Sequence, residues 1–274
     1  MKHKKLFFGF VALAGILLVL FALLFGKLFP FSPLAIGFTR HELRNVTVYL
    51  EDGSGFSDYS RFDTFTSGVE AFHRLKFLDK PRIYIFSDRG SYLRKNFTKA
   101  RFCAYPNSRL VVSPWAVEEA GKGIISLEIY LKHELSHVLL YQHMDYLSVC
   151  HYPQWLMEGI AVYSAGQMGS SWYPDKKKTY EIIKKGNYFP PYLYKTSGED
   201  EVKLSIDNRI AFMYSEFACV VDFIIKTYGN EKFYHYMHGL LKSRDHDKLF
   251  KDIFNIDYYG FLDAFVKHAS SLKD

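Results

Sequence analysis

Residues 124–143 read IISLEIYLKHELSHVLLYQH and combine an apolar helical stripe with a pair of histidines. The apolar side chains that share one helical face are Leu127, Leu131, Leu135, Val138 and Leu139. Apolar residues at this spacing predict an amphipathic helix that packs against a core. His133 and His137 are four residues apart, so both imidazoles project from one face of that helix and can meet one metal ion.

Residues 133–137, HELSH, have the pattern H-E-x-x-H. Imidazole nitrogens are common zinc ligands and bind Zn²⁺ at about 2.0–2.1 Å. Glu134 lies about 100° around the helix from His133. It is therefore poorly placed as a third ligand but close enough to reach a metal-bound water. The pentad also arises by chance in a chain with 11 histidines, so a metal site needs a further ligand.

Residues 155–163, WLMEGIAVY, place a carboxylate within an apolar helical run. A buried carboxylate without a partner is costly, so Glu158 needs a counter-charge, and a metal ion provides one. A catalytic zinc has three protein ligands and one open position. The sequence therefore predicts one Zn²⁺ ion held by His133, His137 and Glu158. Gly159 lacks a side chain, and we expect it to let this helix pack closely on the preceding one.

Together, H-E-L-S-H and W-L-M-E-G-I-A-V-Y resemble the motifs of the gluzincin zinc metallopeptidases, which include thermolysin and aminopeptidase N. The chain is most similar to the small peptidase MA-like domains, over roughly residues 45–270. The resemblance implies a zincin-like fold and cleavage of peptide bonds by a zinc-activated water. It implies that His133, His137 and Glu158 ligate zinc. Glu134 would act as general base and then pass the proton to the leaving amine.

The resemblance also assigns supporting roles, and the sequence departs from the family in one of them. The strand at 109–113 would lie at the sheet edge that pairs with an extended peptide substrate. Thermolysin-like enzymes place an Asp four residues after the ligand Glu, where it supports a metal-bound histidine, and this position is Val162. Tyr214 is the candidate transition-state donor, with a buried core tyrosine as the alternative. We interpret Glu216 as a solvated helix residue that could reach the cleft.

Residues 6–26, LFFGFVALAGILLVLFALLFG, form an uninterrupted apolar segment. A helix of this length spans about 31 Å, which matches the hydrocarbon core of a membrane. We interpret residues 1–28 as an uncleaved transmembrane signal anchor, with a cleaved signal peptide as the alternative. Three lysines precede the segment, at positions 2, 4 and 5, and only Lys27 follows it closely. This bias predicts a single-pass chain with a cytoplasmic N-terminus and an extracytoplasmic domain.

The rest of the chain predicts an α+β fold. Expected strands lie at 46–50, 82–86 and 109–113. Besides the helix at 124–143, expected helices lie at 58–77, 88–97, 154–166, 176–185, 209–228, 231–242 and 258–272. We therefore expect residues 29–44 to be a tether and residues 45–274 to form one domain. A small mixed sheet with helices (45–118) would precede a mainly helical half (119–274).

Composition and motifs exclude one class of function and favour another. The formal net charge is +6, but four lysines flank the apolar N-terminal segment and no dense basic stripe occurs elsewhere, which argues against a nucleic-acid surface. We favour a membrane-anchored peptidase with peptide or protein substrates. Cleavage within the substrate is favoured over aminopeptidase action because a G-x-M-E-N signature is absent. The alternatives are a catalytically silent zincin-fold binding or assembly protein of the cell envelope, and a purely structural metal. An outward-facing domain could also join Cys103 to Cys150.

Overall fold

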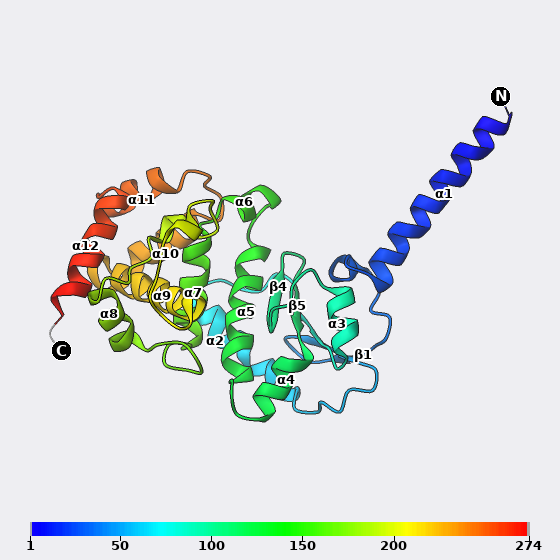
Figure 1. The fold of residues 1–274 in the computed structure, drawn as a ribbon, viewed down its shortest axis with the longest axis horizontal. Helices are drawn as coiled ribbons and strands as arrows, with labels where there is room; N and C mark the ends of the chain where they lie inside the picture. The colour runs from blue at the N-terminus through cyan, green and yellow to red at the C-terminus, as the bar shows by residue number, and fades with distance from the viewer. Residues whose placement is uncertain (1, 273–274) are drawn as a thin grey trace.

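The computed structural model describes residues 2–272. Helix α1 (Lys2–Phe25) projects away from the rest of the chain, which folds into one body (Figure 1). The sheet lies at the end of this body next to α1, and the C-terminal helices lie at the opposite end. The α+β order expected from the sequence is therefore confirmed.

Within the described residues, the sheet has five strands in the order β1-β2-β3-β5-β4. The strands are β1 (Phe38–Glu42), β2 (Thr47–Glu51), β3 (Arg82–Ile85), β4 (Phe102–Tyr105) and β5 (Arg109–Val112). Strands β2, β3 and β5 run parallel and form the centre. Strands β1 and β4 are antiparallel to their neighbours and form the two edges. The three central strands are the ones predicted at 46–50, 82–86 and 109–113.

Alternating side chains on the central strands face two different layers. Val48, Ile83 and Leu110 are fully buried in a cluster that includes the apolar stripe of α5 (Leu127–Gln142). The intervening residues Tyr84 and Val111 belong to a second cluster on the opposite face of the sheet. Helix α3 (Arg89–Lys95) contributes Tyr92 to this second cluster. The period of two along each strand thus places α5 on one face and α3 on the other.

The segment expected to be a tether, residues 29–44, differs from that expectation. Phe29, in the short 3₁₀ helix η1 (Phe29–Phe31), is fully buried against Tyr84 and Phe86. Strand β1 pairs with β2 along its whole length. The strand has no clear alternation because its side chains are exposed or half-buried. Backbone hydrogen bonds at a sheet edge form it, and these leave little signal in the sequence.

Helices make up the remainder of the body. In the N-terminal half they are η2 (Ser60–Thr64), α2 (Phe65–His73), α3 and α4 (Pro114–Gly121). After α5 follow α6 (Tyr146–His151), α7 (Gln154–Ala165), α8 (Lys176–Lys184), η3 (Pro191–Leu193), η4 (Glu199–Glu201), α9 (Arg209–Tyr228), α10 (Asn230–Gly239), α11 (His246–Phe254) and α12 (Tyr258–Ser271). The helices predicted for this half correspond to α7, α8, α9, α10 and α12. The short helices α4, α6 and α11 were not predicted, since few turns carry little periodic signal.

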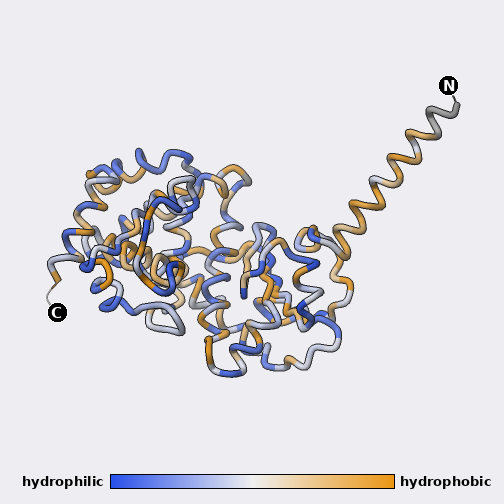
Figure 2. The backbone as a smooth tube through the Cα atoms, viewed as in Figure 1, coloured by the Kyte–Doolittle hydropathy of each residue, from blue (hydrophilic) through white to orange (hydrophobic). Residues whose placement is uncertain are grey.

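Helix α1 is apolar along most of its length (Figure 2). Residues Phe7–Phe25 have a mean hydropathy of 2.9, and none of that window is buried inside the fold. By length and composition this helix could cross a membrane, and a signal sequence near an N-terminus would have the same character.

Helices α7 and α9 form the centre of the helical half, and Gly159 allows their close approach. A Cβ atom at Gly159 would lie 2.7 Å from the Phe217 carbonyl oxygen and 2.9 Å from its carbon. These are backbone atoms of α9 and cannot rotate away. Gly159 therefore brings α7 against α9, rather than against α5 as the sequence suggested. This packing also fixes the position of its neighbour, Glu158.

We predict that Gly159→Ala destabilises the protein by about 1–3 kcal/mol, because the added methyl group overpacks a fixed backbone contact. In a chain of this size the melting temperature should fall by roughly 3–10 °C. Thermal unfolding of the full chain in detergent, followed by circular dichroism, measures this. The matched control is Gly68→Ala on α2, where a Cβ meets nothing within 4 Å. It should be neutral or stabilising by about 0.5–1 kcal/mol. Equal effects of the two variants would contradict the packing argument.

Glu216 on α9 is fully buried, contrary to the solvated position interpreted from the sequence. The Phe189 N–H donates to both carboxyl oxygens at 3.2 Å. Burial raises the pKa of Glu216 well above its ordinary value, and the hydrogen bond from Phe189 opposes this shift without cancelling it. The side chain therefore lies in the core, where burial favours its protonated form, and it does not line the cleft.

The raised pKa of Glu216 predicts a pH-dependent loss of stability. Below the pKa of the unfolded chain, about 4.3, both states carry the proton. Above it the unfolded chain ionises first, so stability falls as the pH rises toward the folded pKa. Glu216→Gln cannot ionise and keeps an acceptor for Phe189. We expect its melting temperature to exceed that of the wild type by a margin that widens between pH 4 and pH 7. A constant margin would rule this interpretation out.

Candidate metal centre

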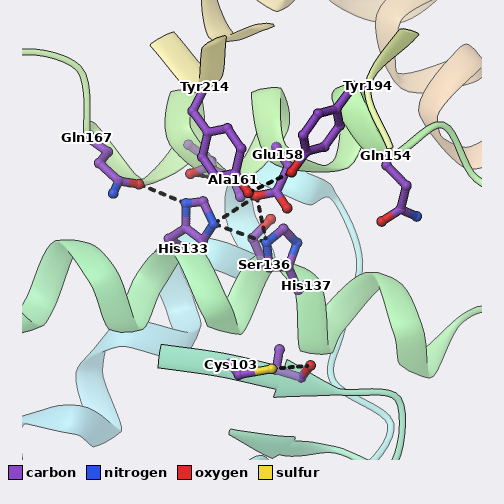
Figure 3. A network of polar contacts seen from close by, with 12 residues as sticks. Cys103, His133, Ser136, His137, Gln154, Glu158, Ala161, Gln167, Tyr194 and Tyr214 are labelled. Carbon is purple, nitrogen blue, oxygen red and sulfur yellow. Dashed lines mark hydrogen bonds and ion pairs between the residues drawn. The ribbon is translucent and has the colours of Figure 1, made fainter. Parts of the chain in front are cut away.

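Helices α5 and α7 bring three side chains together (Figure 3). The Nε2 atoms of His133 and His137 are 3.0 Å apart. The Oε2 atom of Glu158 is 3.2 Å from the first nitrogen and 3.3 Å from the second. All three side chains are buried. The one-turn spacing on α5 and the single carboxylate on α7 thus meet at one point, as the two motifs predict.

The donor set and its spacing fit a tetrahedral zinc ion. Ligands at about 2.0–2.1 Å from such an ion lie about 3.3–3.4 Å from one another. The three separations of 3.0, 3.2 and 3.3 Å are close to these edges. Two imidazoles and one carboxylate leave one of four tetrahedral positions without a protein ligand. This is the composition of a catalytic rather than a closed structural zinc site.

Gln167 orients the first histidine. Its Oε1 atom lies 2.7 Å from Nδ1 of His133, and the residue is fully buried. An amide oxygen accepts, so Nδ1 carries the proton and the lone pair of Nε2 faces the centre. Gln167 follows Gly166, which ends α7 in the left-handed conformation with φ of 65°. The position at which thermolysin-like enzymes carry this supporting residue is Val162, so the sequence did not reveal Gln167, which is placed by the turn after α7.

A second polar contact, between Ser136 and His73, holds α5 against α2. The Oγ atom of Ser136 lies 2.8 Å from Nε2 of His73 on α2, and Nδ1 of His73 lies 2.8 Å from the Val69 carbonyl. Burial lowers the pKa of His73 to about 4, so the ring is neutral. Its Nδ1–H donates to Val69, and the Ser136 hydroxyl donates to Nε2. This bond holds the turn between His133 and His137 against α2.

The charges of the three groups are strongly linked. Burial alone would raise the pKa of Glu158, but the two histidines outweigh it and hold that pKa well below its usual range. Burial alone would lower the pKa of His133, but the hydrogen bond to Glu158 and the charges of Glu134 and Glu158 leave it raised. The carboxylate of Glu158 is thus negatively charged, and in this buried position it is stabilised by positive charge beside it. Protons on the imidazoles or one shared cation can supply that charge.

Glu134 lies beside the triad and does not join it. Its half-buried side chain lines a cavity of about 570 Å³ together with His133, His137 and Glu158. Burial raises the pKa of Glu134, while the two imidazoles and the Ala104 N–H lower it. A carboxylate with a raised pKa beside an open coordination position is suited to accept a proton.

Strand β4 contributes one wall of this cavity, and its position corrects the predicted edge of the sheet. The resemblance predicted the substrate-pairing edge at 109–113, but this strand, β5, lies inside the sheet between β3 and β4. The edge strand is β4, Phe102–Tyr105, and residues 102–104 line the cavity. A hairpin sequence does not reveal which of its two strands pairs with the rest of the sheet.

Cys103 lies on this wall as a free thiol. Burial raises its pKa to about 12. The structure does not join Cys103 to Cys150, which lies on α6, although the sequence allows this disulfide.

Two tyrosines lie above the triad. The ring of Tyr214 stacks on that of His133 with centroids 6.2 Å apart and an angle of 9° between the planes. Its hydroxyl lies 2.8 Å from that of Tyr194, and both phenols point toward Glu158 in Figure 3. Burial raises the pKa of Tyr214 well above its usual value, so the phenol stays protonated and able to donate. No periodic pattern or motif in the sequence singled out Tyr194, since it lies in an irregular segment.

No protein-family model and no curated protein matches this sequence. Among solved structures, the fold is similar to a mutant M1 zinc metallopeptidase from Deinococcus radiodurans, with 14% identity and a TM-score of 0.45. A second similar structure is a two-domain M1 zinc metallopeptidase mutant bound to L-arginine, with 13% identity and a TM-score of 0.46. Each match covers 86% of this chain and 52% of the other, so this chain spans about half their length.

We predict that Gln167→Leu lowers the affinity of the purified chain for Zn²⁺ by about 10–100-fold, because the His133 ring loses the acceptor that fixes its tautomer. Competition with a chromophoric chelator measures the affinity. The matched control is Gln154→Leu, because Gln154 lines the same cavity but bonds Tyr152 and Lys195 rather than a histidine. Equal affinities for the two variants would show that Gln167 does not orient a ligand.

Proposed function

We propose that this chain is a membrane-anchored, zinc-dependent peptidase. The observation that carries the proposal is the meeting of His133, His137 and Glu158 at 3.0–3.3 Å, with Glu134 in the same cavity. This arrangement supplies three ligands, one open position and one proton acceptor. A structural site would have no need of the last two. The zincin-like fold implied by the motifs agrees with the helix α5 packed along an edge strand.

Bound zinc would supply a Lewis acid that activates water and polarises a carbonyl group. The protein groups then have separate tasks. Glu134 accepts the proton of the attacking water and delivers it to the leaving amine. Tyr214, a protonated phenol above the triad, donates to the oxyanion that develops on the carbonyl oxygen. Gln167 holds the His133 ring in place throughout.

The edge strand β4 supports a peptide as the substrate. An unpaired strand edge offers main-chain hydrogen bonds to an extended chain without demanding particular side chains. A second cavity of about 890 Å³ lies next to the cavity that the triad lines. It is lined by the turn Pro106–Ser108, which follows the last residue of β4. Tyr141 lines both cavities. Space at both ends of the strand favours cleavage within a polypeptide over removal of a terminal residue.

Helix α1 supports the membrane part of the proposal. Its exposed apolar surface has no partner within the described fold, and its length matches a bilayer. We propose that it stays attached as a single-pass anchor, with residues 1–28 as the anchor segment and the following domain outside the cytoplasm. The excess of lysines before the helix supports this orientation.

We predict that Glu134→Gln and Glu158→Ala separate catalysis from metal binding. Glu134→Gln removes the proton acceptor but no ligand, so zinc content should stay near one ion per chain while turnover falls by about 100-fold or more. Glu158→Ala removes a ligand, so both zinc content and turnover should fall. Elemental analysis and a peptide-library assay on the full chain, with and without chelator, measure the two quantities.

The control for this experiment is Glu118→Gln, which removes an exposed carboxylate of α4 outside the metal cavity. It should change neither zinc content nor turnover. Cleavage that survives in Glu134→Gln would defeat the proposed mechanism. Zinc binding without any cleavage by the wild type would instead favour a binding or assembly protein.

A further inference from the structure

We propose that the folded domain itself contacts the membrane, and that a cavity between α3 and α4 binds the headgroup of an anionic phospholipid. The proposal rests on the part of the proposed function that makes α1 a membrane span. It concerns a surface separate from the metal centre. The two cavities share no lining residue.

The junction between α1 and the domain is short and is held by hydrogen bonds. Gly26, Lys27 and Leu28 alone separate α1 from Phe29, which is fully buried in the domain. The Lys27 ammonium donates to the Leu93 carbonyl at 2.5 Å and to the Asn96 carbonyl at 2.6 Å. The C-terminal end of α3 is thereby held against the last turn of the apolar helix. If α1 spans a membrane, this part of the domain lies at the level of the headgroups.

Exposed apolar side chains surround this junction. Phe31, Leu34 and Ile36 follow the junction along the chain and are 49%, 55% and 40% exposed. Phe97 follows Asn96, the residue bound by Lys27, and is 59% exposed. Single exposed apolar residues are common on soluble proteins. Here two separate segments place them beside the end of an apolar span, where a membrane interface would cover them.

The cavity between α3 and α4 is lined by positively charged side chains. Its volume is about 420 Å³, and it is lined by Arg89, Leu93, Lys99, Trp115 and Glu119. The Arg101 guanidinium pairs with Glu119 and neutralises it. Among residues 2–272, neither Arg89 nor Lys99 has a carboxylate within 4.0 Å, and Arg89 lies 5.4 Å from the centre of the Trp115 ring. The exposed Glu118, itself paired with Lys122, is one carboxylate on which the charge of Arg89 acts. The cavity therefore offers two cations that form no close ion pair, beside apolar walls.

These features together select one occupant. A phosphodiester carries one negative charge, which suits the pair of cations, and the attached glycerol and acyl chains suit Leu93 and Trp115. Leu93 lines the cavity, and its carbonyl binds Lys27 at the end of the span. A lipid in the leaflet around α1 can therefore reach the cavity directly. A soluble phosphate compound would gain nothing from the neighbouring exposed Phe97.

The membrane contact is tested with the full chain in nanodiscs that contain brominated phosphatidylcholine, which quenches tryptophan at short range. The wild type, with its three native tryptophans, gives the background quenching. The quenching added to this background should be at least about twofold larger in Phe97→Trp than in the matched variant Tyr259→Trp, because only the first introduced side chain lies at the interface. Tyr259 is 56% exposed and belongs to α12. Figure 1 shows α12 at the end of the body opposite α1. Equal quenching of the two variants overturns the contact.

The headgroup site is tested by amide hydrogen exchange of residues 89–99 in the same discs. Replacing phosphatidylcholine with phosphatidylglycerol should slow exchange in the wild type. The effect should be lost in Arg89→Gln/Lys99→Gln and kept in Lys248→Gln/Lys251→Gln, which removes two exposed cations from α11. Slowing that survives in the first variant overturns the site. Equal slowing by inorganic phosphate in phosphatidylcholine discs overturns the assignment to lipid.

Failure of this inference can be told apart from failure of the proposed function. Mass spectrometry of the disc samples shows whether α1 is still attached, and zinc content and peptide cleavage are measured on the same samples. An intact, zinc-bearing, active Phe97→Trp chain whose introduced tryptophan is not quenched overturns the membrane contact alone. A chain that has lost α1 overturns the anchor on which the contact rests.

Discussion

The structure depends on the convergence of three electron-rich atoms in a buried space. Two imidazole nitrogens and one carboxylate oxygen lie within 3.3 Å of one another, on side chains that are at most 8% exposed. Burying a carboxylate beside two lone pairs is unfavourable unless a positive charge is shared among them. Protons can supply this charge at low pH, and a divalent ion displaces them as the pH rises. The surrounding fold holds these atoms together despite that cost.

The fold meets this constraint through packing on three sides. The leucine stripe of α5 is buried against the sheet, which fixes the direction of the two histidines. Gly159 lets α7 touch the backbone of α9, which fixes Glu158. Ser136 and Gln167 then set the turn of α5 and the tautomer of His133. Each of these contacts acts through another residue, so the precision of the site is distributed over both halves of the domain.

The parts of the site that follow from local geometry could be predicted from the sequence. A helix places residues i and i+4 on one face, so His133 and His137 needed no tertiary information. Glu158 was found because a carboxylate in an apolar helix requires a partner. Gln167 was not found, since its position depends on the left-handed turn at Gly166. Glu216 was misplaced because a neutral buried acid and a solvated one look alike in a sequence.

The same limit applies to the sheet, and it matters for the orientation of the cleft. Local patterns located the central strands, but the edges depend on pairing, so β1 was missed and β4 was exchanged with β5. With the edges placed, a continuous path of packed elements runs from Lys27 through α3 and the sheet to α5. The one segment between α1 and the first buried residue of the domain is Gly26–Leu28, and Lys27 within it is bound to α3 and Asn96. If α1 spans a membrane, the contacts along this path hold the edge of β4 and the metal centre in one orientation toward the lipid surface. On the proposed function, a substrate would then have to approach the site from the directions that the membrane leaves open.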